Sequence, residues 1–278
     1  MIPKVIHWCW LSEEPLPEKI QKCVDSWSKH LPDYTIKCWT TENFDVHSVP
    51  YVEETYNLQK WAFCADYIRA YALYSEGGIY LDSDVLVLKS FDEFLHHNFF
   101  SSVEYMPDYV EGLGIAEKCL DPDGTRKEGI PYVQGIGIQA AIMGSIKGHV
   151  YMRACLDYYG QLHFSMNRGY DNMGILAPNI YALNAEQYGF KYKNEDQMLT
   201  EGIMIYKDEV FCVPEFVNQR TCAVHLAAHS WFVPTRKQKV YSKLAKCKAL
   251  KNAFDKFEKN KRSRKLIIWL KTVVWLQK

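Results

Sequence analysis

Residues 61–85 read WAFCADYIRAYALYSEGGIYLDSDV, and this stretch decides the fold. The apolar run 78–81 predicts a buried strand, which we expect to continue to Val87. Because side chains alternate along a strand, Asp82 and Asp84 should point to the same side. Ligands of open α/β sheets gather where strands end, and hard divalent cations take oxygen ligands. The pair therefore predicts a metal site, with a solvated Asp-Ser-Asp turn as the alternative.

The residues before this strand predict a helix over 57–76. Asn57 can cap its start, and Gly77 can adopt the left-handed conformation that ends it. Asp66 and Arg69 lie three residues apart and share one face of this helix. They could form a surface ion pair. Alternatively, Arg69 could face an anionic group that is held beside the two aspartates.

The rest of the chain alternates between strand and helix patterns. We expect strands at 5–10, 34–39, 133–143, 203–206 and 210–213, helices at 18–30, 148–160 and 175–188, and a loop-rich segment at 101–131. Strand and helix alternating at the start of a chain predict a doubly wound α/β fold. We expect one catalytic domain over residues 1–235, followed by a tail over 236–278.

The net charge of zero conceals two oppositely charged parts. Residues 236–278 hold 15 lysines and arginines against Asp255 and Glu258, which leaves 18 basic and 31 acidic residues in the first 235. The tail could be solvated, could bind nucleic acid, or could attach to an anionic membrane surface. We favour membrane attachment, because the basic residues alternate with aromatic side chains at positions 254, 257, 269 and 275. The apolar end, 266–276, is too short to span a bilayer.

The cysteines and the N-terminus indicate the compartment. Nine cysteines are scattered through the 278 residues without a CxxC pair, which argues against a zinc ribbon and a disulfide framework. The first residues lack a charged leader followed by a long apolar stretch, so we expect no signal peptide. These features favour a cytoplasmic protein, peripherally associated with the inner face of the plasma membrane through its tail.

Residues 61–85 resemble the signature of the DXD-containing glycosyltransferases of family 32. This family includes capsular polysaccharide transferases and fungal initiating mannosyltransferases, and the clostridial glucosylating toxins are distantly similar. The residues that match its pattern are Asp66, Arg69, Gly77, Gly78, Tyr80, Asp82 and Asp84. Ala65 stands where the family often has serine, so a hydroxyl contact expected there is lost. The resemblance implies a GT-A-type nucleotide-sugar-binding fold with a central, mostly parallel sheet flanked by helices.

Two further segments extend the resemblance over residues 1–235. The segment 2–10 is similar to the family's opening strand, which implies that Trp10 stacks on the nucleotide base. The segment 223–231, AVHLAAHSW, resembles the family's closing motif. That similarity implies a metal ligand from His225 or His229, with His225 preferred because it follows an apolar strand end.

The resemblance implies retaining transfer of a hexose from a nucleotide diphosphate sugar, with UDP favoured and GDP possible. The acceptor would be a glycan, such as a lipid-linked capsular or surface polysaccharide precursor. Asp82, Asp84 and His225 are assigned to a Mn²⁺ or Mg²⁺ ion, which stabilises the charge of the leaving group. Arg69 is assigned to catalysis with the two aspartates. The donor contacts are assigned to Trp10, Asp66, Arg69, Tyr80, Asp82, Ser230 and Trp231.

Other interpretations remain open. The residues Glu195-Asp196-Gln197 could act near the acceptor or form a solvated loop. The motif DSDV also fits the nucleophile motif of haloacid dehalogenase-type phosphatases, with Asp82 attacking a phosphoryl group. In that fold the motif ends the first strand, whereas here two strands are expected before it. A non-catalytic, membrane-bound glycan-binding protein is the third possibility.

Overall fold

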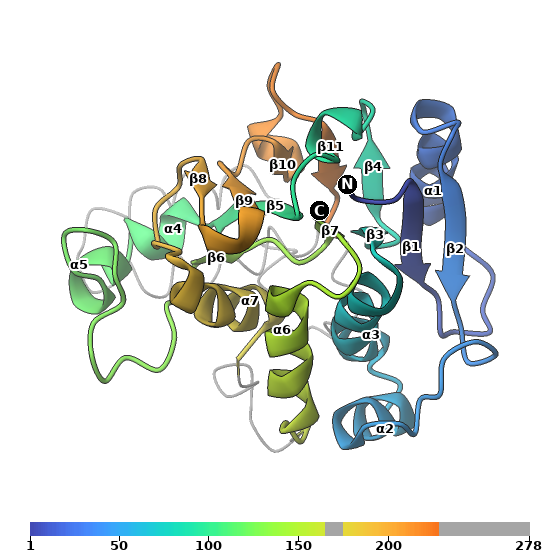
Figure 1. Cartoon of the computed structure of the whole chain (residues 1–278), viewed down its shortest axis with the longest axis horizontal. Coiled ribbons are helices and arrows are strands. Elements are labelled where there is room, and N and C mark those ends of the chain that lie inside the picture. Colours follow the sequence, from blue (N-terminus) through green and yellow to red (C-terminus); the bar gives the residue numbers. More distant parts are fainter. Residues whose placement is uncertain (165–174, 228–278) are drawn as a thin grey trace, which may run out of the picture.

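The computed structural model describes residues 1–164 and 175–227, which fold around two β-sheets (Figure 1). The large sheet has eight strands in the order β2-β1-β3-β7-β5-β9-β8, and β6 pairs with β5 outside this row. The small sheet has three strands in the order β10-β11-β4. The strands are β1 (Val5–Cys9), β2 (Thr35–Trp39), β3 (Gly78–Leu81), β4 (Val85–Val87), β5 (Phe99–Tyr105), β6 (Ile136–Ile138), β7 (Ile142–Ser145), β8 (Gln197–Met198), β9 (Ile203–Tyr206), β10 (Phe211–Cys212) and β11 (Ala223–His225).

The large sheet is mixed, and most of its strands share one direction. β1 runs parallel to both β2 and β3, and β5 runs parallel to β9. β7 lies between β3 and β5 and is antiparallel to both, so these two groups point the same way. The expected α/β fold with a mostly parallel central sheet flanked by helices is therefore confirmed.

Helices cover both faces of the sheet. α2, α3, α6 and α7 pack side by side on one face, and α1 packs against β4 on the other (Figure 1). The helices are α1 (Glu18–His30), α2 (Pro50–Asn57), α3 (Trp61–Glu76), α4 (Pro107–Val110), α5 (Ile115–Cys119), α6 (Val150–Gly160) and α7 (Ala177–Ala185). Among the described residues, no helix is both long and apolar enough to cross a membrane.

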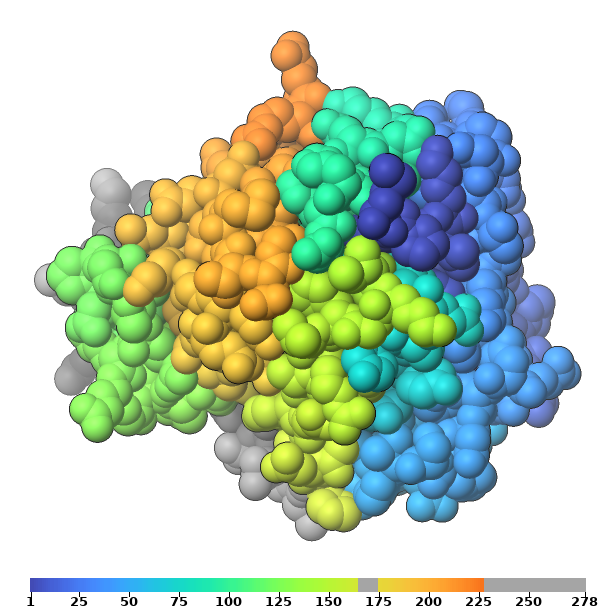
Figure 2. Space-filling model, in the orientation of Figure 1, coloured from blue at the N-terminus to red at the C-terminus, as the bar shows by residue number. Residues whose placement is uncertain are grey.

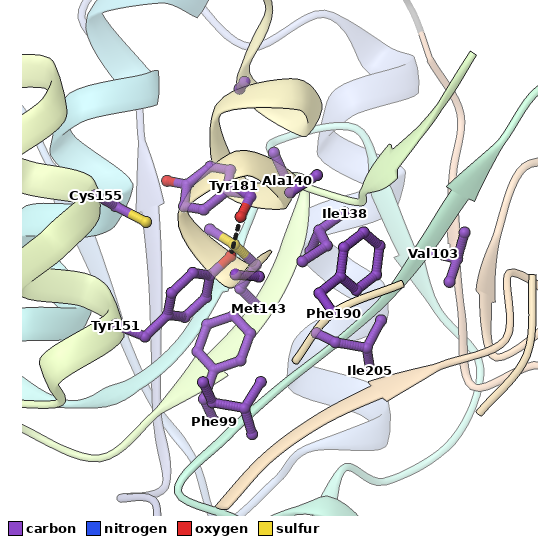
Figure 3. Close-up of a cluster of buried hydrophobic side chains, with 14 of the residues drawn as sticks. Phe99, Val103, Ile138, Ala140, Met143, Tyr151, Cys155, Tyr181, Phe190 and Ile205 are labelled. Carbon is purple, nitrogen blue, oxygen red and sulfur yellow. Dashed lines mark hydrogen bonds between the residues drawn. The ribbon is translucent and has the colours of Figure 1, made fainter. Parts of the chain in front are cut away.

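Strand β5 separates two hydrophobic cores. Its odd positions, Phe99 and Val103, belong to the core beneath α6 and α7, where the Tyr151 hydroxyl donates to the Tyr181 carbonyl at 2.8 Å (Figure 3). Phe100 points to the opposite core, which also contains Trp27 of α1 and strands of the small sheet. The alternation of β5 therefore places each of its side chains on either the helix side or the small-sheet side.

Several predicted elements are confirmed, and others have different boundaries. The helix at 18–30 and the strands at 34–39 and 203–206 agree with α1, β2 and β9 within one residue. The expected start of the long helix is wrong: Asn57 ends α2, and α3 begins at Trp61. The Gln59 backbone between them has φ of 55°, which breaks the helical path.

The expected strand from Gly78 to Val87 is also two elements. β3 ends at Leu81 in the large sheet, β4 begins at Val85 in the small sheet, and the two aspartates lie in the turn between them. The segment 133–143 is likewise divided between β6 and β7, and the segment expected to be loop-rich contains most of β5. Short apolar strands that change sheets are indistinguishable by sequence pattern from one continuous strand.

The turn into β3 is held by a buried histidine. The His7 ring, Nε2 to the Gly77 carbonyl oxygen, makes a 2.8 Å hydrogen bond, and its Nδ1 accepts from Trp39 Nε1 at 3.1 Å. Gly78 has φ of 114°, and a Cβ there would lie 2.6 Å from the Val5 carbonyl oxygen. Only glycine fits this close approach between β1 and β3.

The remaining surface features are simpler. The segment between β10 and β11 projects from the body of the protein (Figure 2), and it carries the exposed side chains of Phe216 and Val217. Eight cysteines fall within the described residues, and all of them are free thiols. The predicted tail, 236–278, lies outside the described residues.

We expect Gly78→Ala to reduce the free energy of unfolding by about 3 kcal/mol or more, since it adds backbone strain to a collision with backbone. Gly148→Ala is the matched control, because Gly148 also has a positive φ, 74°, but nothing lies within 4 Å of its Cβ position. The control should lose about 1 kcal/mol. Urea denaturation measures the loss in free energy of unfolding for both variants. Equal losses would show that the close approach to the Val5 carbonyl adds nothing to the cost of the substitution.

Candidate metal centre

Two aspartates and a histidine from distant parts of the chain form the candidate metal centre. One ligand atom from each of Asp82, Asp84 and His225 lies within 4.8 Å of the others. His225 Nε2 is 3.3 Å from an Asp84 carboxylate oxygen, and all three side chains are buried or half-buried. The sequence-predicted metal residues are therefore together in the structure.

The crossing from one sheet to the other presents the two aspartates. The Asp82 backbone N–H donates to the Ala141 carbonyl at the end of the large sheet, at 2.8 Å. The Val85 N–H then donates to the Asp82 carbonyl at 3.0 Å, which closes the turn. The carboxylates emerge from this turn, so neither belongs to a strand.

The small sheet supplies the histidine. β11 pairs antiparallel with β4, which places His225 opposite Val85. The Leu226 N–H donates to the Asp84 carbonyl at 3.0 Å and fixes the next step of the register. Helix α1 anchors β4 from behind, because Trp27 Nε1 donates to the Val85 carbonyl at 2.8 Å. The position of His225 thus follows from strand register.

Arg69 connects three segments beneath the aspartates. Its guanidinium is buried and lies 3.0 Å from an Asp66 oxygen and 3.1 Å from an Asp82 oxygen. It also donates to the Ala140 carbonyl at 2.7 Å, and Nε donates to the Ala65 carbonyl at 3.2 Å. Of the two alternatives, a surface ion pair of Asp66 and Arg69 is wrong, since the pair is buried and includes Asp82.

Two neighbours of Arg69 complete this cluster. Burial raises the pKa of Asp66 to about 7, with Arg69 opposing the shift and Asp82 adding to it. The Tyr80 ring is buried in the core, 5.0 Å beneath the Arg69 guanidinium. The predicted donor contact of Tyr80 stays a prediction, while its observed contact is with Arg69.

The charges around His225 favour its protonated form. Burial alone would lower the pKa of His225, but Asp84, Asp82 and Glu104 outweigh burial and raise it to about 9. Glu104, near the end of β5, is a half-buried acid that the sequence pattern did not single out. Its mark in the sequence is a single glutamate after the segment FFSSV. This is a weak signal when the strand itself is not recognised.

The other predicted site residues have mixed outcomes. Trp10 follows the end of β1, is half-buried beside Trp8, and donates through Nε1 to the Glu14 carbonyl at 3.0 Å. Asp196 is ion-paired with Arg220 at 2.7 Å and Gln197 begins β8, so this segment is more structured than the solvated loop that was one of its two interpretations. His229, Ser230 and Trp231 lie outside the described residues, so their predicted roles stay predictions.

The donor set fits a hard or borderline divalent cation. Two carboxylates and one imidazole are ligands that Mg²⁺ and Mn²⁺ accept, and the imidazole favours Mn²⁺ over Mg²⁺. The carboxylates that raise the pKa of His225 would also attract a cation. No cysteine belongs to this cluster, so the set differs from that of a structural zinc site.

Comparison with known proteins agrees with the resemblance inferred from the sequence. Residues 17–101 match the family described as "Glycosyltransferase sugar-binding region containing DXD motif". The match includes Asp66, Arg69, Asp82 and Asp84 but ends before β11. The resemblance to DXD-containing glycosyltransferases is thereby confirmed for this region.

The similar proteins are glycosyltransferases. Inositol phosphoceramide mannosyltransferase 3 of Schizosaccharomyces pombe is 36% identical over 34% of this chain and 28% of its own length. Inositol phosphoceramide mannosyltransferase 2 of the same organism is 34% identical over 54% of this chain and 36% of its own length. The chain thus spans about a third of these relatives. Among solved structures, PaToxG glycosyltransferase is 19% identical, with a TM-score of 0.45 over 67% of this chain and 69% of that chain.

Replacing Arg69 by methionine should reduce the free energy of unfolding by about 3–5 kcal/mol, because it leaves two carboxylates facing each other without their shared cation. Arg153→Met is the control, since Arg153 forms an exposed ion pair with Asp157 on α6. Its unfolding midpoint should stay close to that of the wild type. Denaturant titration of both variants distinguishes a structural Arg69 from one that is dispensable for folding.

Proposed function

We propose that this protein is a metal-dependent, retaining glycosyltransferase that moves a hexose from a nucleotide diphosphate sugar to a glycan acceptor. A UDP-sugar is the favoured donor, and a GDP-sugar is the alternative. The observation that carries the proposal is the meeting of Asp82, Asp84 and His225 within 4.8 Å at the DXD turn of a matched sugar-binding region.

The chain's own residues suit this reaction. A divalent ion at the centre supplies positive charge to the diphosphate leaving group. Asp84 and His225 would hold the ion, and Asp82 has a more exposed carboxylate, 24% of the side chain, that could reach both ion and donor. Arg69 fixes the direction of Asp82 by hydrogen bonding to one of its oxygens. We therefore assign Arg69 a positioning role. For Asp66 we propose the role predicted from the sequence, recognition of a sugar hydroxyl.

The donor and acceptor sides are proposed from different features. Trp10, at the end of β1, would stack on the base, and Ser230 and Trp231 would bind the phosphates. We propose a lipid-linked glycan as acceptor, because the basic and aromatic tail suits the surface of an anionic membrane. We propose that this acceptor is a capsular or surface polysaccharide precursor, which the protein would glycosylate at the inner face of the plasma membrane.

The rival functions have less support. In a haloacid dehalogenase-type phosphatase the aspartate motif would end the first strand, whereas here it follows β3, after β1 and β2. A glycan-binding protein without catalysis does not require a carboxylate and histidine cluster beside the DXD turn. Neither rival explains why the two aspartates of the cluster lie in the matched family region.

Asp84→Asn should abolish the stabilisation of the protein by UDP or GDP together with Mn²⁺, and should reduce nucleotide-sugar hydrolysis at least a hundredfold, because the variant loses an anionic ligand of the ion. Thermal-shift assays and release of nucleoside diphosphate measure the two effects. Asp45→Asn, which changes an exposed loop aspartate, is the control and should behave as the wild type. Full activity of Asp84→Asn would refute the proposed function, and metal-dependent hydrolysis of p-nitrophenyl phosphate would favour the phosphatase.

Membrane attachment is testable with the full-length chain. The protein should sediment with vesicles of anionic phospholipid at low salt and be released as salt is raised, since screening weakens attraction between basic residues and headgroups. Replacing Lys261, Arg262, Arg264 and Lys265 by glutamine should weaken this binding. Equal sedimentation with neutral phosphatidylcholine vesicles, or no effect of salt, would count against electrostatic attachment.

A further inference from the structure

Glu104 is a carboxylate near the candidate metal centre that the proposed reaction has not yet used. It is half-buried at the next-to-last position of β5. Within residues 1–164 and 175–227, no hydrogen bond or ion pair of its side chain is found. This distinguishes it from Glu186, which is part-buried and forms an ion pair with Arg126 at 2.7 Å.

The alternation of β5 determines which way Glu104 faces. The even positions of the strand face the small sheet: the Phe100 ring lies 5.6 Å from that of Phe211, and the Ser102 hydroxyl donates to the Phe211 carbonyl at 3.1 Å. Val103 faces the other way, into the core beneath α6 and α7 (Figure 3). Glu104 therefore lies on the same side as Ser102, two residues further along.

The small sheet connects this side of β5 with His225. Phe211 of β10 is opposite Ala223 of β11, and His225 is two residues beyond Ala223. Ser102 bonds to Phe211 of β10, and β10 pairs with β11, so Glu104 faces the small sheet that carries His225. Burial raises the pKa of Glu104 to about 7, and the charge of His225 opposes this shift, which agrees with this placement.

The residue opposite Glu104 has no side chain that could donate a hydrogen bond to it. Its partner on β6 is Gly137, which has no side chain, and a Cβ there would lie 2.6 Å from the Pro178 carbonyl oxygen of α7. Arg69, the buried arginine of the site, is already bonded to Asp66 and Asp82. The Glu104 carboxylate is thus available to a ligand that brings its own donors.

We propose that Glu104 is a substrate-binding residue whose carboxylate accepts a hydrogen bond from a sugar hydroxyl held next to the metal centre. The inference rests on the proposed function. A carboxylate has only acceptors, and a sugar hydroxyl is a donor that reaches it without bringing a competing charge. The hydroxyl could belong to the transferred hexose or to the acceptor, and the two sources give different kinetic results.

The test uses Glu104→Met, which keeps the length of the side chain but removes both carboxylate oxygens, in the whole 278-residue chain with Mn²⁺. The probes are UDP and GDP, their glucose and mannose conjugates, and methyl glucoside or methyl mannoside as acceptor. If the hydroxyl is on the donor, affinity for the nucleotide sugar should fall at least tenfold while affinity for the nucleoside diphosphate stays unchanged. If it is on the acceptor, donor binding should stay unchanged and the KM for the methyl glycoside should rise at least tenfold.

Two outcomes would overturn the inference. No change in any of these constants would show that Glu104 does not bind sugar. An equal loss of affinity for diphosphate and nucleotide sugar would show that it acts through His225 and the metal. Glu128→Gln, at an exposed glutamate, controls for the loss of one negative charge. A wild-type protein without Mn²⁺-dependent nucleotide binding would instead contradict the proposed function, which separates the two failures.

Discussion

The burial of one arginine is the constraint on which the site depends. A guanidinium in the protein interior needs acceptors for its donors, and Arg69 finds them on α3, on the turn after β3 and on the segment before β7. These three segments must therefore meet at one point. Because Asp82 is one of the acceptors, the requirement that stabilises Arg69 also sets the direction of a candidate metal ligand. Stability and function are coupled at this residue.

The second constraint is the passage of the chain between two sheets. If β3 had continued into β4 as one strand, Asp82 and Asp84 would occupy ladder positions and their backbone groups would be used in pairing. The change of sheet instead produces a tight turn, whose carboxylates are directed outward. The same change creates an edge on β4 that β11 can pair with, and that pairing brings His225 to the turn. A single interruption of strand structure thus accounts for all three predicted ligands.

Much of this could be predicted from the sequence, and the failures have physical causes. The motif residues Asp66, Arg69, Asp82 and Asp84 stand out because a helix, a glycine turn and a short apolar strand place them at one end of the sheet. The break between β3 and β4 could not be predicted, because one continuous strand and two short strands in succession show the same apolar pattern. Glu104 does not stand out, because the sequence predicts a loop-rich segment where most of β5 lies. Its partners are set by long-range pairing, which local pattern does not report.

The order of the strands along the chain has a consequence for biosynthesis. A protein is made from its N-terminus, and domains fold as the chain emerges. The two aspartates are present early, whereas β11 is the last described strand and pairs with β4 only after β10 has been made. A nascent chain that has reached β10 can hold most of the large sheet but lacks the histidine. The candidate metal centre therefore gains its histidine only once β11 has been made, and a chain that stops before β11 exposes the acidic turn without that predicted ligand.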